Sequence, residues 1–288
     1  MARSLRDLHV LRTELRGHEF FAAGVPWYVA LFGRDSLVTA LETVAFRPGV
    51  AEETLRLLAR YQGTRSDRSR DEQPGKILHE LRVGEMANLH EIPHTPYYGT
   101  VDATPLFLIL VERHAAWTGS LRLFRELRGH VEAALGWIET ERREGGTGYL
   151  GYASGTPHGL ANQGWKDSWD AIRNADGSLA RPPIALVEVQ GYVYRALVGI
   201  ADLYDRDGDG ERARELRADA EDLRRRFNRD FWVDELGSYA LALQGGGSPV
   251  AVVSSNTGQA LWTGIVDLDH AASVEATLAS EAMFSGWA

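Results

Sequence analysis

The sequence contains no cysteine among its 288 residues, and it has no long uninterrupted apolar segment. The absence of cysteine excludes disulfide bonds, thiolate catalysis and metal sites with cysteine ligands. A membrane-spanning helix needs about 20 consecutive apolar residues, and no such run is present. The first residues, MARSLRD, lack the apolar core of a signal peptide. We therefore expect a soluble, cytoplasmic protein without a membrane partner.

Positive charge is also scarce, because 31 Lys and Arg residues stand against 40 Asp and Glu residues, which gives a formal net charge of −9. Nucleic acids and anionic membranes attract basic surfaces, so neither is an expected partner. A neutral substrate fits this charge better. Hydrophobic residues make up 44% of the chain, which is usual for a globular protein, and the length suffices for a large core.

Strand signals are few, and the hydrophobic pattern is mostly helical. Apolar residues spaced three and four apart predict amphipathic helices, and apolar residues on nearly every side of 184–204 predict a buried helix. The expected helices span 35–45, 51–61, 101–117, 120–138, 184–204, 211–227, 257–265 and 270–280, and short strands are expected over 149–152 and 239–243. With no internal repeat or linker, residues 1–288 are expected to form one all-α domain, a toroid of helical hairpins with functional loops at one end.

The segment 162–170, NQGWKDSWD, contains two tryptophans, a lysine and two aspartates beside a glycine. An indole offers a flat apolar face to a sugar ring, and a carboxylic acid beside it can protonate a glycosidic oxygen. Lysine and serine can bind sugar hydroxyl groups. The segment therefore indicates a sugar-cleaving site. The alternative is a surface loop that two tryptophans anchor.

A second candidate region is 23–36, where AGVPWY is followed by FGRDS. Arg34 and Asp35 could hold neighbouring sugar hydroxyl groups, the guanidinium as donor and the carboxylate as acceptor. The alternative is that Asp35 or Ser36 caps a helix while Arg34 forms a surface ion pair. Both possibilities stay open at this point.

Two further segments carry candidate polar residues, the first because aromatics beside a glycine and an acid suit a sugar site. Asp102 follows the aromatic sequence YYGTV, and Glu188 and Gln190 lie at the start of the buried helix. A charge on so apolar a helix needs a partner or a polar cavity. An active-site cleft would supply the cavity, and a structural pair between Glu188 and an arginine is the alternative.

Two patterns resemble metal sites, and neither fits. His79, His90 and His94 lie near two glutamates, but their spacings match no compact ligand motif. The segment 205–216 copies the first half of a calcium loop, but Leu216 stands where a bidentate glutamate is needed. We expect a turn between helices there, with weak calcium binding as the lesser alternative, and we expect no metal or cofactor at the candidate site.

Seven segments together carry a family resemblance: GVPWYVALFGRDSLVTALE, PGKILHELRVGEM, YYGTVDATPLFL, NQGWKDSWDAI, IALVEVQGYVYRAL, SNTGQALWTGI and MFSGW. In this order they resemble the bacterial amylo-α-1,6-glucosidase (glycogen debranching enzyme-like) family. These enzymes are relatives of the glucoamylases, trehalases and other six-hairpin glycosidases. The resemblance covers nearly the whole chain and implies an (α/α)6 toroid.

The resemblance also implies inverting hydrolysis of α-linked glucosides, with an α-glucan as the substrate. Asp167 matches the general acid, and Arg34 and Asp35 match the pair that grips the terminal glucose. The remaining residues expected to bind substrate are Trp27, Asp102, Trp165, Lys166, Glu188 and Gln190. An inverting base must lie about 6.5 to 9.5 Å from the acid, with a water molecule between them.

Members of that family continue well past a segment like MFSGW and begin with a β-rich domain. We therefore expect a fragment that lacks N-terminal and C-terminal parts of its parent protein, with the toroid incomplete at its C-terminus and the general base beyond residue 288. Two alternatives stay open. One is a carbohydrate-binding fragment without catalysis, and the other is a trehalase-like or mannosyl-glycoside hydrolase on the same fold.

Overall fold

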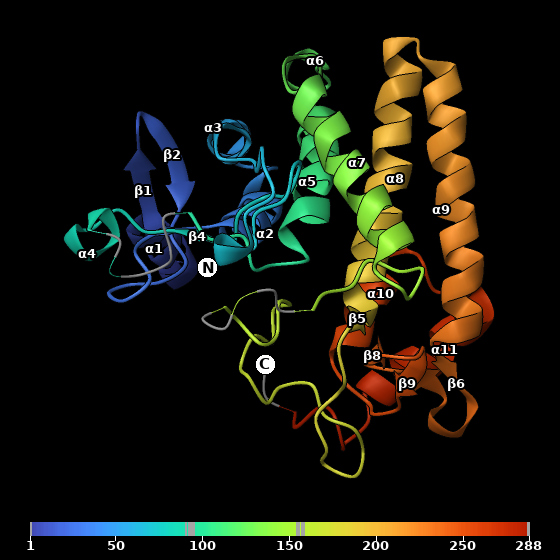
Figure 1. Ribbon diagram of the computed structural model, residues 1–288. Coiled ribbons are helices and arrows are strands. Elements are labelled where there is room, and N and C mark those ends of the chain that lie inside the picture. The colour runs from blue at the N-terminus through green and yellow to red at the C-terminus, as the bar shows by residue number, and fades with distance from the viewer. Residues whose placement is uncertain (1, 90, 92–95, 154–155, 157–158, 287–288) are drawn as a thin grey trace. The chain divides into compact units, whose positions relative to one another are not determined.

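The computed structural model describes residues 2–89, 91, 96–153, 156 and 159–286. Contacts divide the chain into two compact units, Met1–Trp137 with Ser154–Leu160 and Ile138–Ala153 with Ala161–Ala288, and each is considered by itself. Both units are mostly helical and contain only short strands (Figure 1). None of the described helices is long and apolar enough to cross a membrane. The single domain expected from the sequence stays a prediction.

In the first unit, α2 (Gly33–Thr43), α3 (Pro48–Arg60) and α5 (Ala103–Thr118) pack against one another. Helix α5 is buried on nearly all sides, which agrees with its almost uninterrupted run of apolar residues. Helix α3 has its buried residues on one face, as its three-and-four spacing requires. These three helices form the core of the unit.

The first unit begins with elements that the sequence pattern did not predict. Helix α1 (Ala2–Leu11) precedes an antiparallel hairpin of β1 (Arg12–Leu15) and β2 (His18–Phe21). Later come β3 (Leu31–Phe32), which pairs with β4 (Glu80–Leu81), the 3-10 turn η1 (Arg68–Arg70) and α4 (Glu85–Asn88). Strands this short carry too few residues for an alternating pattern to stand out.

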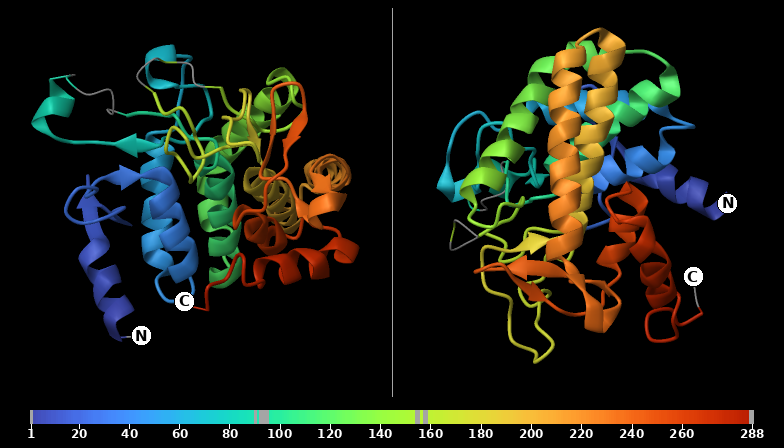
Figure 2. Two further views of the ribbon diagram at one scale, coloured as in Figure 1. Left: turned by 90° about the horizontal axis from the view of Figure 1, so that it is seen from below. Right: turned by 90° about the vertical axis from the view of Figure 1, so that its right-hand side faces the viewer.

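The core of the second unit is a hairpin of two long helices, α8 (Val187–Asp207) and α9 (Gly210–Asp230), which lie side by side in both panels of Figure 2. Gly208 adopts a left-handed conformation (φ 91°) after α8, and the Asp209 carboxylate caps α9 by accepting from the backbone N–H of Arg212 at 3.2 Å. The turn between helices expected at this place is confirmed.

A three-stranded antiparallel sheet lies at the end of α8 where that helix begins (Figure 1). It consists of β5 (Ala185–Leu186), β8 (Ala242–Gln244) and β9 (Ser248–Val250). The unit is completed by β6 (Trp232–Val233), the 3-10 turn η2 (Asp234–Leu236), β7 (Ser238–Tyr239), α10 (Asn256–Thr263) and α11 (Leu268–Leu278). Strand β5 continues directly into α8, so the sheet fixes the position of the first turn of that helix.

Several predicted elements are wrong in detail. The strand over 239–243 is two strands, β7 and β8, which belong to different sheets. The single helix over 120–138 is two helices, α6 (Arg122–Glu126) and α7 (Arg128–Glu144), with the break at Leu127. The buried side chains Phe124, Leu127 and Val131 keep the helical spacing across the break, so the pattern does not reveal it. The strand over 149–152 is only an isolated bridge between Tyr152 and Ile184.

Candidate functional site

Two residues of the first unit form a buried ion pair at the starts of neighbouring helices. Arg34 lies in the first turn of α2, and Asp102 immediately precedes α5. Nε of Arg34 donates to Oδ2 of Asp102 at 2.6 Å, and the Thr100 hydroxyl donates to Oδ1 at 2.7 Å. The Asp102 side chain is only 1% exposed. Burying a charge is costly unless it is paired and hydrogen-bonded, and both conditions are met here.

Close backbone packing brings these two helix starts together. The N–H of Gly33 donates to the carbonyl oxygen of His79 at 2.8 Å. A Cβ atom at Gly33 would lie 2.2 Å from the carbonyl oxygen of Leu78 and 3.2 Å from Cβ of Ala103, the first residue of α5. Only glycine fits this approach, so the sequence Gly-Arg-Asp places Arg34 beside the start of α5.

The other two residues predicted in the first unit are more open to solvent. Trp27 lies in the loop before β3, where its side chain is 80% exposed. Asp35 is half-buried in the first turn of α2. An exposed indole is available for stacking on a sugar ring. Because Arg34 binds Asp102 directly, its joint action with Asp35 on one sugar stays a prediction.

In the second unit, Asn162 braces the loop that carries Asp167. Its Oδ1 accepts from the Tyr152 hydroxyl at 2.8 Å, and its Nδ2 donates to the carbonyl oxygen of Ser168 at 2.7 Å. The bond to Ser168 joins the two ends of the segment that contains Asp167, and the bond from Tyr152 fixes Asn162 itself. Asp167 is half-buried. Asn162 is absent from the predicted site residues, because a bracing amide leaves no spacing signal in the sequence.

The same loop lies against the first turn of α8. A Cβ atom at Gly164 would lie 2.2 Å from Cδ1 of Leu186 and 3.6 Å from Oε1 of Glu188, which is fully buried. Burial lowers the pKa of the Lys166 ammonium group, and the nearby charge of Glu188 offsets part of this effect. The structure thus brings the charges of Lys166 and Glu188 near each other, and a shared substrate pocket at these residues stays a prediction.

Gln190 uses its side-chain amide to hold the backbone. Its Nε2 donates to the carbonyl oxygens of Leu150 at 2.8 Å and Leu186 at 3.0 Å, and its Oε1 accepts from the N–H of Leu150 at 3.1 Å. The amide therefore ties the segment near Leu150 to the start of α8. Its predicted contact with substrate stays a prediction.

The two tryptophans of the loop keep much of their surface open. Trp165 is 47% and Trp169 is 68% exposed. The ammonium group of Lys166 lies 5.1 Å from the ring centroid of Trp165, and the guanidinium of Arg173 lies 6.0 Å from that of Trp169. Such open indoles fit stacking on a sugar better than shielding Asp167 from water.

The arrangement therefore places a carboxyl group, an ammonium group and aromatic faces within one braced loop. These are the groups that cleavage of a glycosidic bond uses. The Arg34–Asp102 pair belongs to the first unit and the Asp167 loop to the second, and each cluster is defined within its own unit.

The histidines of the sequence analysis do not build a metal centre in the part of the chain that the structure describes. Within those residues, no three His, Cys, Asp or Glu side chains gather as metal ligands would. The ring of His79 is buried and packs edge-on against Phe32 and Tyr97. His90 and His94 lie outside the described residues.

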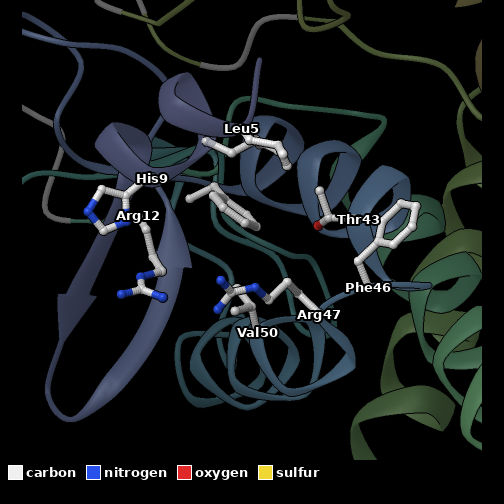
Figure 3. Close-up of a pocket in the computed structure, with 9 residues that line it drawn as sticks. Leu5, His9, Arg12, Thr43, Phe46, Arg47 and Val50 are labelled. Carbon is white, nitrogen blue, oxygen red and sulfur yellow. The ribbon is translucent and has the colours of Figure 1, made fainter. Parts of the chain in front are cut away.

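A separate cavity of about 120 Å³ lies in the first unit beside α1 (Figure 3). Leu5, Leu8, Phe21 and Val50 give it apolar walls, and basic side chains such as Arg47 also line it. None of its nine lining residues is an Asp or a Glu, and none is a predicted site residue. Without a carboxyl group, this cavity lacks the acid that glycoside cleavage requires.

A sequence model of the family described as the mannosylglycerate hydrolase MGH1-like glycoside hydrolase domain matches residues 28–287. No curated protein sequence matches the chain. Among solved structures, the GH63 mannosylglycerate hydrolase of Thermus thermophilus, in complex with Tris and D-glycerate, is similar with a TM-score of 0.66 at 15% identity. The similarity covers 95% of this chain and 75% of that chain.

Two other solved structures are similar over most of the chain. The GH78 rhamnosidase of a Bacillus species has a TM-score of 0.67 at 17% identity, over 95% of this chain and 25% of that chain. A metal-independent α-mannosidase of Streptococcus pneumoniae, in a complex with α-1,6-mannobiose, has a TM-score of 0.61 at 15% identity, over 97% of this chain and 71% of that chain. The chain is thus a mostly helical domain that matches part of six-hairpin glycosidase structures. It spans only a quarter of the length of the rhamnosidase.

Proposed function

This chain belongs to the mannosylglycerate hydrolase MGH1-like glycoside hydrolase domain family, and from this premise we propose that it acts in the hydrolysis of an α-linked mannosyl glycoside. It is a glycoside hydrolase domain of the six-hairpin clan, with a mostly helical fold. Beyond this family-level activity, we propose that the sugar is mannose and we propose which residues act on it. The complete (α/α)6 toroid, of which this chain would form part, belongs to the same proposal.

One observation carries the proposal, namely the braced loop around Asp167 beside the first turn of α8. Asn162 fixes the loop through Tyr152 and Ser168, and Gly164 lets it approach Glu188 closely. A carboxyl group acts as a general acid only when it is held in position against the departing oxygen. A loop fixed by two hydrogen bonds meets this requirement better than a free surface loop.

In the proposed reaction, the carboxyl group of Asp167 donates its proton to the glycosidic oxygen as the bond to the anomeric carbon breaks. A water molecule attacks that carbon from the opposite face and loses a proton to a carboxylate base, which inverts the configuration. Lys166 would donate to sugar hydroxyl groups and Glu188 would accept from them, while Trp165 would stack on the ring. None of these residues is assigned as the base.

The mannosyl substrate is preferred over the α-glucan that the sequence resemblance implies. The matching family model is named for a mannosylglycerate hydrolase, and two of the similar structures are a mannosylglycerate hydrolase and an α-mannosidase. Mannose and glucose differ only in the orientation of one hydroxyl group, so a single hydrogen-bonding residue can separate them. Amylo-α-1,6-glucosidase activity stays a prediction with less support.

The test is hydrolysis of mannosylglycerate, α-1,6-mannobiose, maltooligosaccharides, branched dextrin and trehalose by the chain and by the longest protein its reading frame encodes. NMR of the first product reports its anomeric configuration. We expect hydrolysis of α-mannosides with β-mannose as the first product. Asp167→Asn should abolish this hydrolysis. Glucose release alone would favour the debranching activity. Sugar binding that survives Asp167→Asn, without hydrolysis in either form, would favour a carbohydrate-binding module.

A further inference from the structure

Helices α8 and α10 begin on the same side of the three-stranded sheet. Strand β8 pairs antiparallel with both β5 and β9, so β5 and β9 run in the same direction. Strand β5 leads directly into α8, and β9 leads through residues 251–255 into α10. Leu186 and Val250, the last residues of β5 and β9, both pair with Ala242, so the chain departs toward both helices from the same edge of the sheet.

Helices α8 and α10 contact each other near Gly191 and Ala260. A Cβ atom at Gly191 would lie 2.5 Å from Oγ1 of Thr263 and 3.4 Å from Cα of Ala260, so the helices touch closely there. Gly191 is the fifth residue of α8, and Ala260 is the fifth residue of α10. Gly191 and Ala260 each lie four residues, or about 6 Å, from the first residue of their helix. Because both helices follow strands that end opposite Ala242, Asn256, the first residue of α10, lies at the same end of the helix pair as Glu188.

The side chain of Asn256 is deeply buried and has no partner in the part of the chain that the structure describes. It is 1% exposed, and neither its Oδ1 nor its Nδ2 has a hydrogen-bond partner. The start of α10 is held without it, because Thr257 donates through both its N–H and its hydroxyl to the carbonyl oxygen of Ser254. A buried amide that neither caps the helix nor meets another polar group is unfavourable for folding alone.

We propose that Asn256 binds a hydroxyl group of the substrate sugar, at the end of the α8–α10 pair where Glu188 lies. An amide suits a neutral polyol, because its N–H groups donate and its carbonyl oxygen accepts. Lys166, Glu188 and Asn256 together would offer the sugar one cationic donor, one anionic acceptor and one group that does both. The inference rests on the proposed function, since it assigns a residue to the same sugar site. It adds a residue that the motif-based list of site residues does not contain.

The test compares Asn256→Leu, Asn256→Ala and wild type in the longest protein that the reading frame encodes. KM and kcat are measured with p-nitrophenyl α-D-mannoside, and affinity with methyl α-D-mannoside by titration calorimetry. Loss of a hydrogen bond to one hydroxyl group is expected to raise KM and Kd about tenfold in both variants. Leucine has nearly the same shape and no polar atom, so the melting temperature of Asn256→Leu should equal or exceed that of wild type.

Gln259 is an exposed residue of α10, and Gln259→Ala serves as the control. This substitution should change neither the affinity for the mannoside nor the melting temperature. If wild type binds and cleaves the mannoside and Asp167→Asn stops cleavage, but Asn256→Leu leaves KM and Kd within twofold, only the role of Asn256 is overturned. A structural role would instead lower the melting temperature of Asn256→Leu without a specific loss of affinity. If wild type neither binds nor cleaves any of these sugars, the proposed function fails and the assignment of Asn256 fails with it.

Discussion

Arg34 and Asp102 are separated by 68 positions in the sequence, yet Nε of Arg34 donates to Oδ2 of Asp102 at 2.6 Å. The bond joins the first turn of α2 to the residue that precedes α5. Asp102 is 1% exposed, and the Arg34 side chain is 13% exposed. This is a buried pair, so its removal has consequences that a surface pair would not have.

Replacement of Arg34 by Ala is expected to lower the free energy of unfolding by about 3 kcal/mol, because it leaves a buried carboxylate without its cation. Urea unfolding, followed by circular dichroism, measures this change. Arg143→Ala removes exposed pairs with Glu139 at 3.8 Å and Glu144 at 3.4 Å and should change stability by less than about 0.5 kcal/mol. Equal effects of the two substitutions would contradict the burial argument.

Gly164→Ala is expected to reduce kcat/KM about 100-fold, because the new Cβ atom would meet Leu186 and push the Asp167 loop away from α8. The cost in stability should be about 1 to 3 kcal/mol. Gly136→Ala is a matched control, since a Cβ atom at this exposed position of α7 meets no atom within 4 Å and should stabilise the helix by about 0.5 to 1 kcal/mol. Full activity in Gly164→Ala would show that the loop tolerates displacement.

Glu188→Gln is expected to lower the pKa of Lys166 further, because the Glu188 charge is what offsets the effect of burial. Lys76 and Lys166 are the only lysines in the sequence, so ¹³C-methylation gives two titrating lysine signals in NMR spectra. Lys76→Arg assigns them. An unchanged pKa of Lys166 in Glu188→Gln would mean that the two side chains do not interact.

The same lowered pKa makes stability depend on pH. The unfolded chain has the ordinary lysine value of 10.5, so between the lowered pKa and 10.5 the unfolded state binds more protons than the folded state. Lys166 therefore disfavours folding at neutral pH, and this penalty disappears as the pH rises through that window. The difference in unfolding free energy between wild type and Lys166→Met should change across the window and level off above it. A constant difference would contradict the shift.

Gln190→Leu is expected to lower the free energy of unfolding by about 2 to 3 kcal/mol, because it leaves the buried N–H and carbonyl groups of Leu150 without their side-chain partner. The change also removes the bond to the carbonyl oxygen of Leu186. Thermal and urea unfolding both measure the loss. Gln259→Ala, on the exposed side of α10, is the control and should be neutral.

The helices were largely predictable because their apolar spacing reflects burial. Helix α9 was expected over 211–227 and spans Gly210–Asp230, since Leu216, Leu223 and Phe227 are its buried face. The hairpin of β1 and β2 is not predictable from the hydrophobic pattern, because four-residue strands are too short to show clear alternation. The pattern predicts that α8 begins at residue 184, whereas it begins at Val187, because Ala185 and Leu186 are as apolar as a helix core but pair with β8.

The site was predictable in its local parts and not in its long-range contacts. The sequence 162–170 places Lys166 and Asp167 in one loop, and that much follows from adjacency. Two contacts depend on packing between segments that are distant in the sequence: the bond between Arg34 and Asp102 and the approach of Gly164 to Glu188. Such packing produces no local sequence pattern. The roles of Asn162 and Asn256 likewise depend on burial and hydrogen bonding, which a motif does not record.

The hairpin of α8 and α9 leaves the three-stranded sheet after β5, and the chain returns to that sheet at β8. Its Gly208–Asp209 turn is separated from Glu188 by nearly the whole length of α8, about 30 Å for its 21 residues. New termini or an inserted fluorescent domain at this turn would leave the sheet pairing and the Asp167 loop covalently intact. The turn is therefore the natural attachment point for circular permutation, surface immobilisation or a reporter that does not crowd the sugar site.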